Sequence, residues 1–151
     1  MKKIYGNIIF IILIFLFFIS IFSNQVKNQD IKYIIKPYIL KVLDGDTILI
    51  KTKEGTASVR LTGIDCYETK MNSHIKYQKT DDISYEEIFE RGRLAKERLE
   101  NLVSDKNISL EITGIDRKYG RFVGVLYSGK NINKEMLKDD LCKVYVFKPK
   151  K

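Results

Sequence analysis

The chain has 151 residues, a formal net charge of +8 and 44% hydrophobic residues, enough for one compact domain with an additional N-terminal segment. One histidine and two separated cysteines do not supply the four ligands of a tetrahedral zinc site. A basic chain favours polyanionic partners because lysine and arginine neutralise phosphates, but an ordinary lysine-rich surface has the same composition. Charge alone therefore permits a nucleic-acid partner without establishing one.

Residues 1–23 are predicted to lie outside the folded domain. Lys2 and Lys3 precede an apolar run at 8–22, in the order of a signal segment. This run is 15 residues long, whereas a membrane-spanning helix needs roughly 17–25 residues. Counting from residue 4 lengthens the run to 19 residues. We therefore expect either a cleaved signal peptide or a membrane anchor through residues 4–22. In both cases the domain is exported from the cytoplasm. Cleavage would leave it secreted or periplasmic, whereas an anchor would hold it at the membrane outside the cytoplasm.

A polar linker at 24–37 is predicted to lead into one domain at 38–149. Five segments have the alternating pattern or the flanking turn signals of strands: 38–43, 47–53, 56–64, 107–115 and 121–127. A helix is expected between the third and fourth strands, because Ser84 and Glu87 have capping-box spacing and apolar residues follow at helical spacing. Gly92 within this pattern leaves open a later helix start. A further helix is expected at about 133–140. The pattern predicts an α+β domain, mainly β, with two to three helices around a small barrel.

Three polar segments fall at the ends of the predicted strands. They are Asp44-Gly-Asp46-Thr, then Arg60-(four residues)-Asp65-x-x-Glu68, and then Asp116-x-Lys-Tyr-Gly-Arg121. Carboxylate oxygens suit a hard divalent cation. Arginine suits a phosphate because its planar guanidinium donates two parallel hydrogen bonds. Together these segments predict metal-assisted attack on a phosphodiester.

The three segments, in this order and with every charged position filled, resemble the active-site segments of the thermonuclease (staphylococcal nuclease-like, SNase) family. The resemblance extends from about Tyr38 to Pro149, and residues 141–149 are similar to the last strand region of that family. It implies a five-stranded OB-fold barrel, a fold whose mouth and loops hold nucleic acid. It also implies a Ca²⁺-dependent endonuclease that hydrolyses DNA, RNA or both with low sequence specificity. We expect the protein to be a monomer.

The resemblance and the residue chemistry together give an expected role to ten positions. The metal ligands are Asp46, Asp65 and the backbone carbonyl of Cys66; the catalytic residues are Glu68 as general base or water-positioning group and Arg60 and Arg121 as phosphate clamp; the substrate-binding residues are Lys118, Tyr119, Tyr145 and Phe147. Several of these positions have a simpler interpretation in isolation. The acidic segment alone is a hairpin turn, Glu68 an exposed loop residue, the arginines surface ion pairs, and the two aromatic residues near the C-terminus core or rim packing.

The sequence departs from the family pattern around Glu68. Tyr67 replaces a proline, so the loop lacks one fixed φ angle and Glu68 is expected to be less rigidly aimed. Cys66 replaces a threonine, which a main-chain ligand tolerates. The segment 70–89 is longer than its family counterpart and is predicted to alter substrate access. His74 lies in this polar segment, and we interpret it as incidental and remote from the motifs.

Two further questions stay open at the level of the sequence. Cys66 and Cys142 either form a disulfide, as exported domains permit, or remain buried thiols that pack as small apolar residues. The main alternative function is a catalytically inactive nucleic-acid-binding OB-fold module anchored at the membrane. The presence of all the key carboxylates and arginines argues against that alternative. A membrane-anchored interaction domain with fortuitous motifs is a further alternative, and it predicts that divalent ions do not change stability.

Overall fold

The computed structural model describes residues 33–104 and 107–146. The chain divides between Ile31 and Lys32, and all described residues belong to the second part. The apolar run at 8–22 and the predicted substrate contact Phe147 lie outside the described residues. Within the described ranges, no helix is both long enough and apolar enough to span a membrane.

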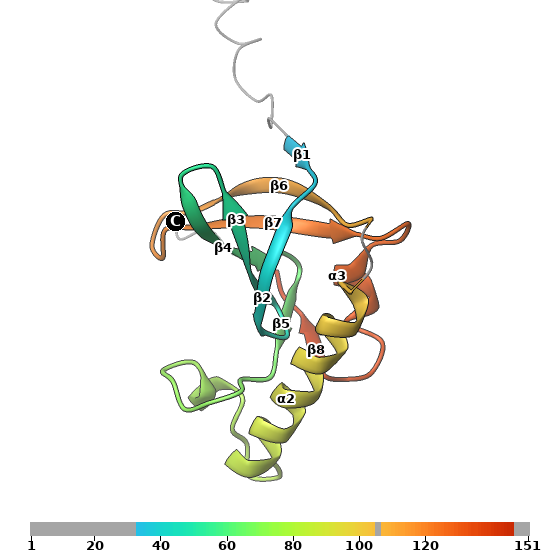
Figure 1. The fold of residues 1–151 in the computed structure, drawn as a ribbon. Coiled ribbons are helices and arrows are strands. Elements are labelled where there is room, and N and C mark those ends of the chain that lie inside the picture. The colour runs from blue at the N-terminus through green and yellow to red at the C-terminus, as the bar shows by residue number, and fades with distance from the viewer. Residues whose placement is uncertain (1–32, 105–106, 147–151) are drawn as a thin grey trace, which may run out of the picture. The chain divides into compact units, whose positions relative to one another are not determined.

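Strands predominate, and the domain is α+β, as predicted (Figure 1). The elements in chain order are β1 (Tyr33–Ile35), β2 (Tyr38–Asp44), β3 (Thr47–Thr52), β4 (Gly55–Leu61), β5 (Ile64–Cys66), the 3₁₀ helix η1 (Ile75–Tyr77), α2 (Tyr85–Leu102), β6 (Ser109–Asp116), β7 (Arg121–Tyr127), α3 (Ile132–Glu135) and β8 (Cys142–Val144).

Six strands form one sheet in the order β1-β6-β7-β4-β3-β2, and β5 pairs separately with β8. All neighbouring strands of the sheet are antiparallel except β4 and β7, which are parallel. The hydrogen-bonded order is open between β1 and β2, but only Lys36 and Pro37 separate these strands in the chain. Pro37 has no N–H to donate to a ladder, so it divides one long strand into two pieces that pair with opposite edges. The chain itself therefore joins the two edges of an OB-like sheet.

The structure corrects several predicted boundaries. Residues 33–35 of the predicted linker form β1, so the sheet has six strands and not five. The predicted strand at 56–64 is interrupted by a turn at Gly63, whose φ of +81° favours glycine, and the chain resumes as β5. The segment expected to be helical at 133–140 forms only the short helix α3.

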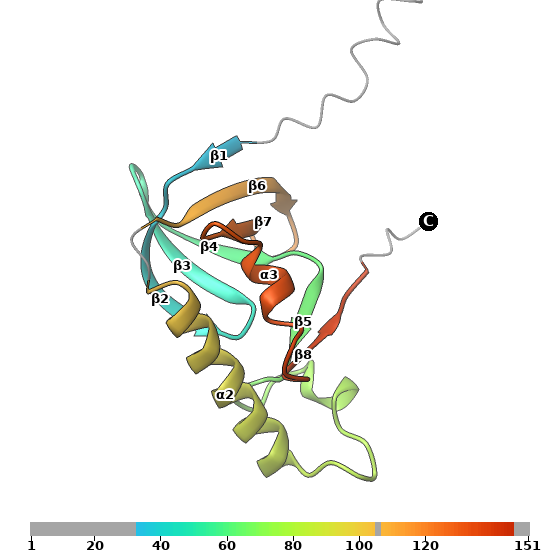
Figure 2. The ribbon, with the colours of Figure 1, turned by 90° about the vertical axis from the view of Figure 1, so that its right-hand side faces the viewer.

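Helix α2 begins at Tyr85, directly after the Ser84 cap, and continues through Gly92, so the later start is wrong. The Ser84 hydroxyl accepts a hydrogen bond from the Glu87 N–H at 3.1 Å, as the capping pattern predicts. The C-terminal half of the helix lies against β2 (Figure 2). Its buried residues Ala95 and Leu99 join the main core.

Two hydrophobic clusters fix the parts of the domain. The larger one fills the space between the sheet and α2, and its most buried side chains are Ile48, Ile50, Val59, Leu61, Ile64, Leu99, Leu110, Leu126, Ile132 and Met136. Burial of such a side chain contributes about 1.5–3 kcal/mol. The smaller cluster joins Tyr67, Ile75 and Ile88. It fastens the segment around η1 to the first half of α2, next to the loop that carries Glu68.

Candidate functional site

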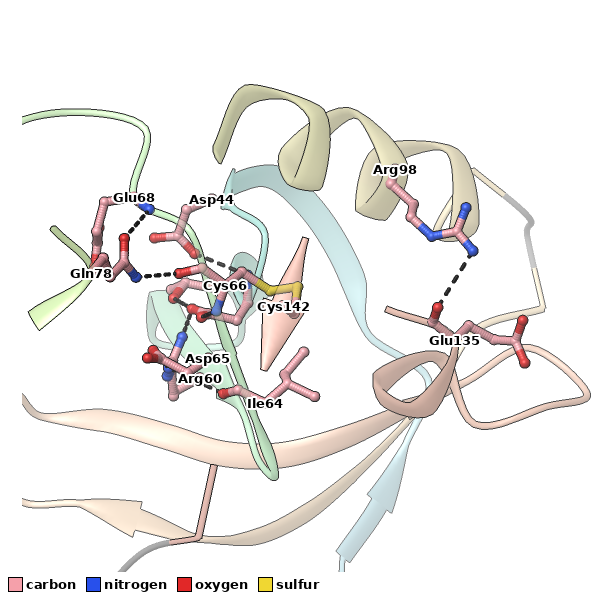
Figure 3. The surroundings of a disulfide bond; sticks show 12 residues. Asp44, Arg60, Ile64, Asp65, Cys66, Glu68, Gln78, Arg98, Glu135 and Cys142 are labelled. Atoms are coloured by element: carbon pink, nitrogen blue, oxygen red, sulfur yellow. Dashed lines mark hydrogen bonds and ion pairs between the residues drawn. A yellow bond between two sulfur atoms is a disulfide. The ribbon is translucent and has the colours of Figure 1, made fainter. Parts of the chain in front are cut away.

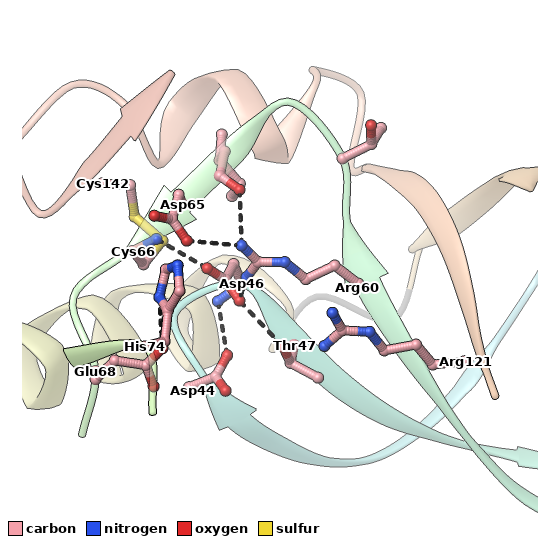
Figure 4. A network of polar contacts seen from close by, with 12 residues as sticks. Asp44, Asp46, Thr47, Arg60, Asp65, Cys66, Glu68, His74, Arg121 and Cys142 are labelled. Atoms are coloured by element: carbon pink, nitrogen blue, oxygen red, sulfur yellow. Dashed lines mark hydrogen bonds and ion pairs between the residues drawn. A yellow bond between two sulfur atoms is a disulfide. The ribbon is translucent and has the colours of Figure 1, made fainter. Parts of the chain in front are cut away.

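Asp46 is held by the turn between β2 and β3 and by β5 (Figure 4). The Asp44 carboxylate accepts the Asp46 N–H at 3.1 Å, which shapes the turn. The Asp46 carboxylate is buried and accepts the Cys66 N–H at 2.8 Å through Oδ2 and the Thr47 hydroxyl at 3.0 Å through Oδ1. Burial raises the pKa of Asp44, and hydrogen bonding by Thr47 and the charge of Arg60 act in the opposite direction.

Arg60 joins the two predicted metal-ligand carboxylates. The residue stands on β4 directly opposite Thr47 of β3, so the strand register brings it to the acidic turn. Its guanidinium pairs with Asp46 Oδ1 and lies 2.9 Å from Asp65 Oδ1, and it donates to the Ile64 carbonyl at 3.2 Å. Burial lowers the pKa of Arg60, chiefly opposed by the charge of Asp65. Arg60, Asp46 and Asp65 therefore form one compact ionic group.

Arg121 lies at the start of β7, and its guanidinium is near that of Arg60 (Figure 4). It is held by Asp116, with 3.1 Å between Nε and Oδ2, and its Cζ lies 4.9 Å from the centre of the Tyr119 ring. Its positive charge is also among the causes that lower the pKa of Arg60. Two guanidinium groups held near one another suit the binding of a group that carries more than one negative oxygen.

Glu68 lies on the loop after β5, and its carboxylate is held by the segment that follows it. Asn72 Nδ2 donates to Glu68 Oε2 at 2.6 Å, and His74 Nδ1 lies 3.2 Å from Oε1. The expectation that His74 lies remote from the motifs is therefore wrong, because the segment folds back over the loop and brings the imidazole beside Glu68. The backbone N–H of Glu68 donates to Gln78 Oε1 at 2.9 Å.

Two glycines allow the site loops to approach helix α2 closely. A Cβ at Gly92 would lie 2.3 Å from the Glu68 carbonyl oxygen and 2.8 Å from that of Tyr67. A Cβ at Gly45 would lie 2.7 Å from the Cβ of Ala95 and 2.8 Å from that of Cys66. Gly92 therefore stands within the helix, despite its low helix propensity, because the loop that carries Glu68 rests directly on the helix backbone.

The predicted substrate-binding residues lie in two places. Lys118 and Tyr119 are on the turn before Arg121, where Lys118 Nζ lies 4.8 Å from the centre of the exposed Tyr119 ring. A hydrogen bond to Tyr119 is the main cause that raises the pKa of Lys118. Tyr145 follows β8, is exposed, and donates its backbone N–H to the Gly63 carbonyl at 3.0 Å. Exposure of both tyrosine rings leaves them accessible to a ligand.

Cys66 and Cys142 form a disulfide, so the structure takes the first of the two alternatives left open by the sequence (Figure 3). The two residues are directly opposite one another in the β5–β8 pair. The bridge links residues 76 positions apart and holds the strand of Asp65 to the C-terminal strand. It lies immediately before the loop of Glu68.

The oxygen donors of the site fit a calcium ion. Within 33–104 and 107–146, no three His, Cys, Asp or Glu side chains gather in a way that could hold a metal. The expected donors are instead two carboxylates, Asp46 and Asp65, and a main-chain carbonyl, Cys66. The two carboxylates share one guanidinium, so they are close neighbours. Such hard oxygen donors, completed by water, suit Ca²⁺ and not a soft transition metal.

The strand order, with carboxylates and arginines gathered at one end, defines an OB-like α+β domain. The sequence profile of the family described as Staphylococcal nuclease homologue matches residues 58–151. The chain belongs to this family. The matched range includes Arg60, Asp65, Glu68 and Arg121 but begins after Asp46. The structure brings Asp46 to that matched region through its contacts with Arg60 and Cys66.

Three curated relatives have names that refer to endonucleases. An uncharacterized endonuclease of Escherichia coli O157:H7 is 28% identical over 109 residues, covering 71% of this chain and 59% of that protein. The SPbeta prophage-derived endonuclease YokF of Bacillus subtilis (strain 168) is 31% identical over 113 residues, covering 72% of this chain and 34% of that protein. An uncharacterized endonuclease of Haemophilus influenzae is 32% identical over 108 residues, 71% of this chain and 51% of that protein. The chain thus spans between one third and three fifths of the length of these relatives.

Sequence reasoning did not find the residues that hold Glu68. Asn72, His74 and Gln78 belong to the long segment 70–89, for which the sequence indicated only a polar loop. The usable signal was the apolar Ile75, which is buried against Tyr67 and Ile88 and anchors the segment. A branched apolar residue within a largely polar stretch indicates a point at which such a segment returns to the core.

Proposed function

We propose that the protein is an exported, calcium-dependent endonuclease that hydrolyses DNA, RNA or both with little sequence preference. One observation carries this proposal: Asp46 and Asp65 share the Arg60 guanidinium, with Arg121 beside it. Separated on the chain by strands and loops, these residues converge where a metal-bound phosphate would need both oxygen ligands and guanidinium donors. Endonuclease names among relatives over some 70% of this chain support the same reaction.

Within this proposal, Asp46, Asp65 and the Cys66 carbonyl would hold Ca²⁺. The bound ion supplies a positive charge that polarises a phosphoryl oxygen and orients water. Arg60 and Arg121 bind the non-bridging phosphate oxygens, which become more negative as water adds to phosphorus. Guanidinium groups already fixed by Asp65 and Asp116 stabilise this charge without reorganising, so they favour the transition state over the bound substrate.

The proposed general base is Glu68. Its carboxylate accepts a proton from the attacking water as the new bond from water oxygen to phosphorus forms. The bond from phosphorus to the leaving ester oxygen breaks, and that oxygen leaves with the electron pair and takes up a proton from solvent. Asn72 and His74 contact the two oxygens of Glu68 and limit the directions that the carboxylate can take. Lys118, Tyr119 and Tyr145 provide a cation and exposed rings for neighbouring nucleotides.

The proposal of export rests on the N-terminal segment and on the cysteines. Lys2 and Lys3 followed by the apolar run have the order of a signal segment, with membrane anchoring through residues 4–22 as the alternative to cleavage. The Cys66–Cys142 disulfide suits an oxidising compartment. Mass analysis of the protein purified from its native source tests this part. A mass that lacks residues 1–23 indicates secretion, the full mass in the membrane fraction indicates an anchor, and the full mass in the cytosol contradicts export.

Hydrolysis by the purified protein tests the proposed reaction. Supercoiled plasmid and a long RNA are incubated with Ca²⁺, with Mg²⁺ and with excess chelator. We expect cleavage with Ca²⁺, poor cleavage with Mg²⁺, which demands a stricter octahedral geometry, and none with chelator. Undiminished hydrolysis in chelator contradicts the metal-assisted reaction. Tight binding of nucleic acid without hydrolysis under any of these conditions supports the catalytically inactive binding module instead.

A further inference from the structure

Gln78 is a buried polar residue that the proposed chemistry does not use. It follows η1 in the long segment 70–89 and is 8% exposed. Its amide makes two hydrogen bonds, both to the backbone of the loop that joins the expected metal ligand to the expected base (Figure 3). Nε2 donates to the Cys66 carbonyl at 2.9 Å, and Oε1 accepts the Glu68 N–H at 2.9 Å.

The orientation of this amide is fixed by its partners. The Cys66 carbonyl requires a donor and the Glu68 N–H requires an acceptor, so the amide satisfies both groups in one orientation only. The two bonds span Tyr67 in the way that a neighbouring strand pairs with alternate residues. Gln78 therefore acts as a one-residue strand partner for a loop that has left the β5–β8 pair.

The other side of the loop is held by the main chain. The Tyr67 N–H donates to the Leu141 carbonyl at 3.2 Å, a bond that the proline usual at this position in the family could not make. The Tyr67 ring packs with Ile75 and Ile88. The loop thus lacks the fixed φ angle of a proline but is bonded on both sides, by Leu141 on one and by Gln78 on the other.

We propose that Gln78 is the positioning residue that aims Glu68 at the attacking water, a role that rests on the proposed nuclease function. The same short segment supplies Asn72 and His74 to the carboxylate of Glu68, so it fixes both the backbone and the side chain of the base. The Cys66 carbonyl has a second lone pair, so the bond from Gln78 leaves it able to bind a metal. The segment 70–89 therefore holds the loop of Glu68 in position.

A positioning role changes turnover more than substrate binding. Loss of the bridge frees Glu68 to move, and a displacement of about 1 Å at a reacting group costs up to about 10²-fold in rate. Substrate affinity depends on contacts spread over many lysines and arginines and is expected to change by less than about threefold. A purely structural role for Gln78 instead predicts a lower melting temperature with kcat unchanged per folded molecule.

The experiment compares kcat, KM and melting temperature for the wild type, Gln78→Met and Gln78→Glu. Methionine keeps the length without the hydrogen bonds, and glutamate keeps the acceptor for the Glu68 N–H but removes the donor to Cys66. We expect kcat to fall at least about tenfold in Gln78→Met, with less loss in Gln78→Glu and KM nearly constant in both. Ser84→Ala is the control, because it removes a helix cap in the same region, at a cost of about 1 kcal/mol, without touching the loop.

A double variant separates positioning from other effects. When Glu68→Gln is already present, Gln78→Met should change kcat by no more than about twofold, because the group that Gln78 positions is gone. Equal losses in both backgrounds overturn the inference, as does an unchanged kcat in folded Gln78→Met. An inactive wild type overturns the proposed function and this role with it, whereas an active wild type with an insensitive Gln78 overturns this role alone.

Discussion

Asp46, Arg60 and Asp65 stand on paired strands or on the tight turn between them, whereas Glu68 stands on a loop beyond the end of β5. The first group is fixed by strand register, since Thr47 lies opposite Arg60 and the Asp46 carboxylate bonds the backbone of β5. The second depends on Gln78, Asn72 and His74, three side chains of the following segment. Strand pairing thus positions the strand-borne part of the site, and hydrogen bonds from the segment 70–89 position the loop-borne part.

This difference predicts how each part fails. Loss of a strand-borne residue removes a charge and leaves partners unpaired within a rigid frame. A change around the loop leaves every charged group present but lets the base move. Substitutions in the two regions should therefore distinguish the loss of a charged group from the displacement of the Glu68 carboxylate.

The largest effect is expected from Arg60→Ala. Turnover should fall on the order of 10²–10³-fold, because a fixed donor to the developing phosphate charge is lost. Asp46 and Asp65 also lose their shared partner, so the free energy of unfolding should fall in the absence of Ca²⁺ and recover in part when Ca²⁺ is added. Steady-state kinetics and calcium-dependent melting curves measure the two effects.

Arg93→Ala, on the exposed face of α2, is the control. Retention of near wild-type turnover by Arg60→Ala would remove the guanidinium clamp from the mechanism.

Gly92→Ala tests the loop-borne part without changing any polar group. The added Cβ would meet the Glu68 carbonyl at 2.3 Å, so the loop must shift. We expect kcat to fall by up to about 10²-fold with nucleic-acid affinity nearly unchanged. Gly114→Ala is a matched control, because nothing lies within 4 Å of a Cβ there and its φ is not in the left-handed region. Equal kinetics for the two alanine variants would show that the position of the Glu68 carboxylate does not depend on close packing against α2.

The strand-borne part was the more predictable one from sequence. The positions of Asp46, Arg60 and Asp65 follow from turn signals and alternation, and the structure brings all three together. The first strand was missed in part because Pro37 divides it, and three exposed residues such as those of β1 do not give a burial pattern. The role of 70–89 could not be predicted, because single polar side chains that fold back on a loop have no periodicity. Gly92 left a later helix start open because the reason for the glycine, a loop carbonyl packed against the helix, is a tertiary contact.

The disulfide lies at the boundary between the two parts. Closing a loop between residues 76 positions apart contributes roughly 4 kcal/mol to the free energy of unfolding by chain entropy. We expect reductant, or Cys142→Ala, to lower that free energy by a similar amount and also to lower turnover, because β5 leads directly into the loop of Glu68. Urea unfolding with and without reductant measures the first effect. Identical unfolding curves in both conditions would argue that the bridge does not form in the protein.

Asn133→Ala should have the smallest effect on turnover while still lowering stability. The buried Asn133 amide donates to the carbonyls of Thr62 and Gly124 and accepts the Leu126 N–H, and so it ties the turn after β4 to β7. Its loss removes the partner of the buried Leu126 N–H, at a cost of about 1–3 kcal/mol. Thermal melting and kcat below the melting range measure both quantities. If Asn133→Ala lost more turnover than Gly92→Ala, the expected order of effects would be wrong, and the loop of Glu68 would not be the part most sensitive to small shifts.

The most direct measurement is single-turnover hydrolysis of a labelled oligonucleotide by wild type and Glu68→Gln at saturating Ca²⁺, with calcium binding followed by calorimetry. Glutamine keeps the shape of Glu68 but cannot take a proton from water. We predict a rate at least about 10²-fold lower for Glu68→Gln, with calcium and oligonucleotide affinity retained. A rate close to that of the wild type would contradict the assignment of Glu68 as the base. It would also contradict the division of the site into strand-borne charged residues and a loop that positions the base.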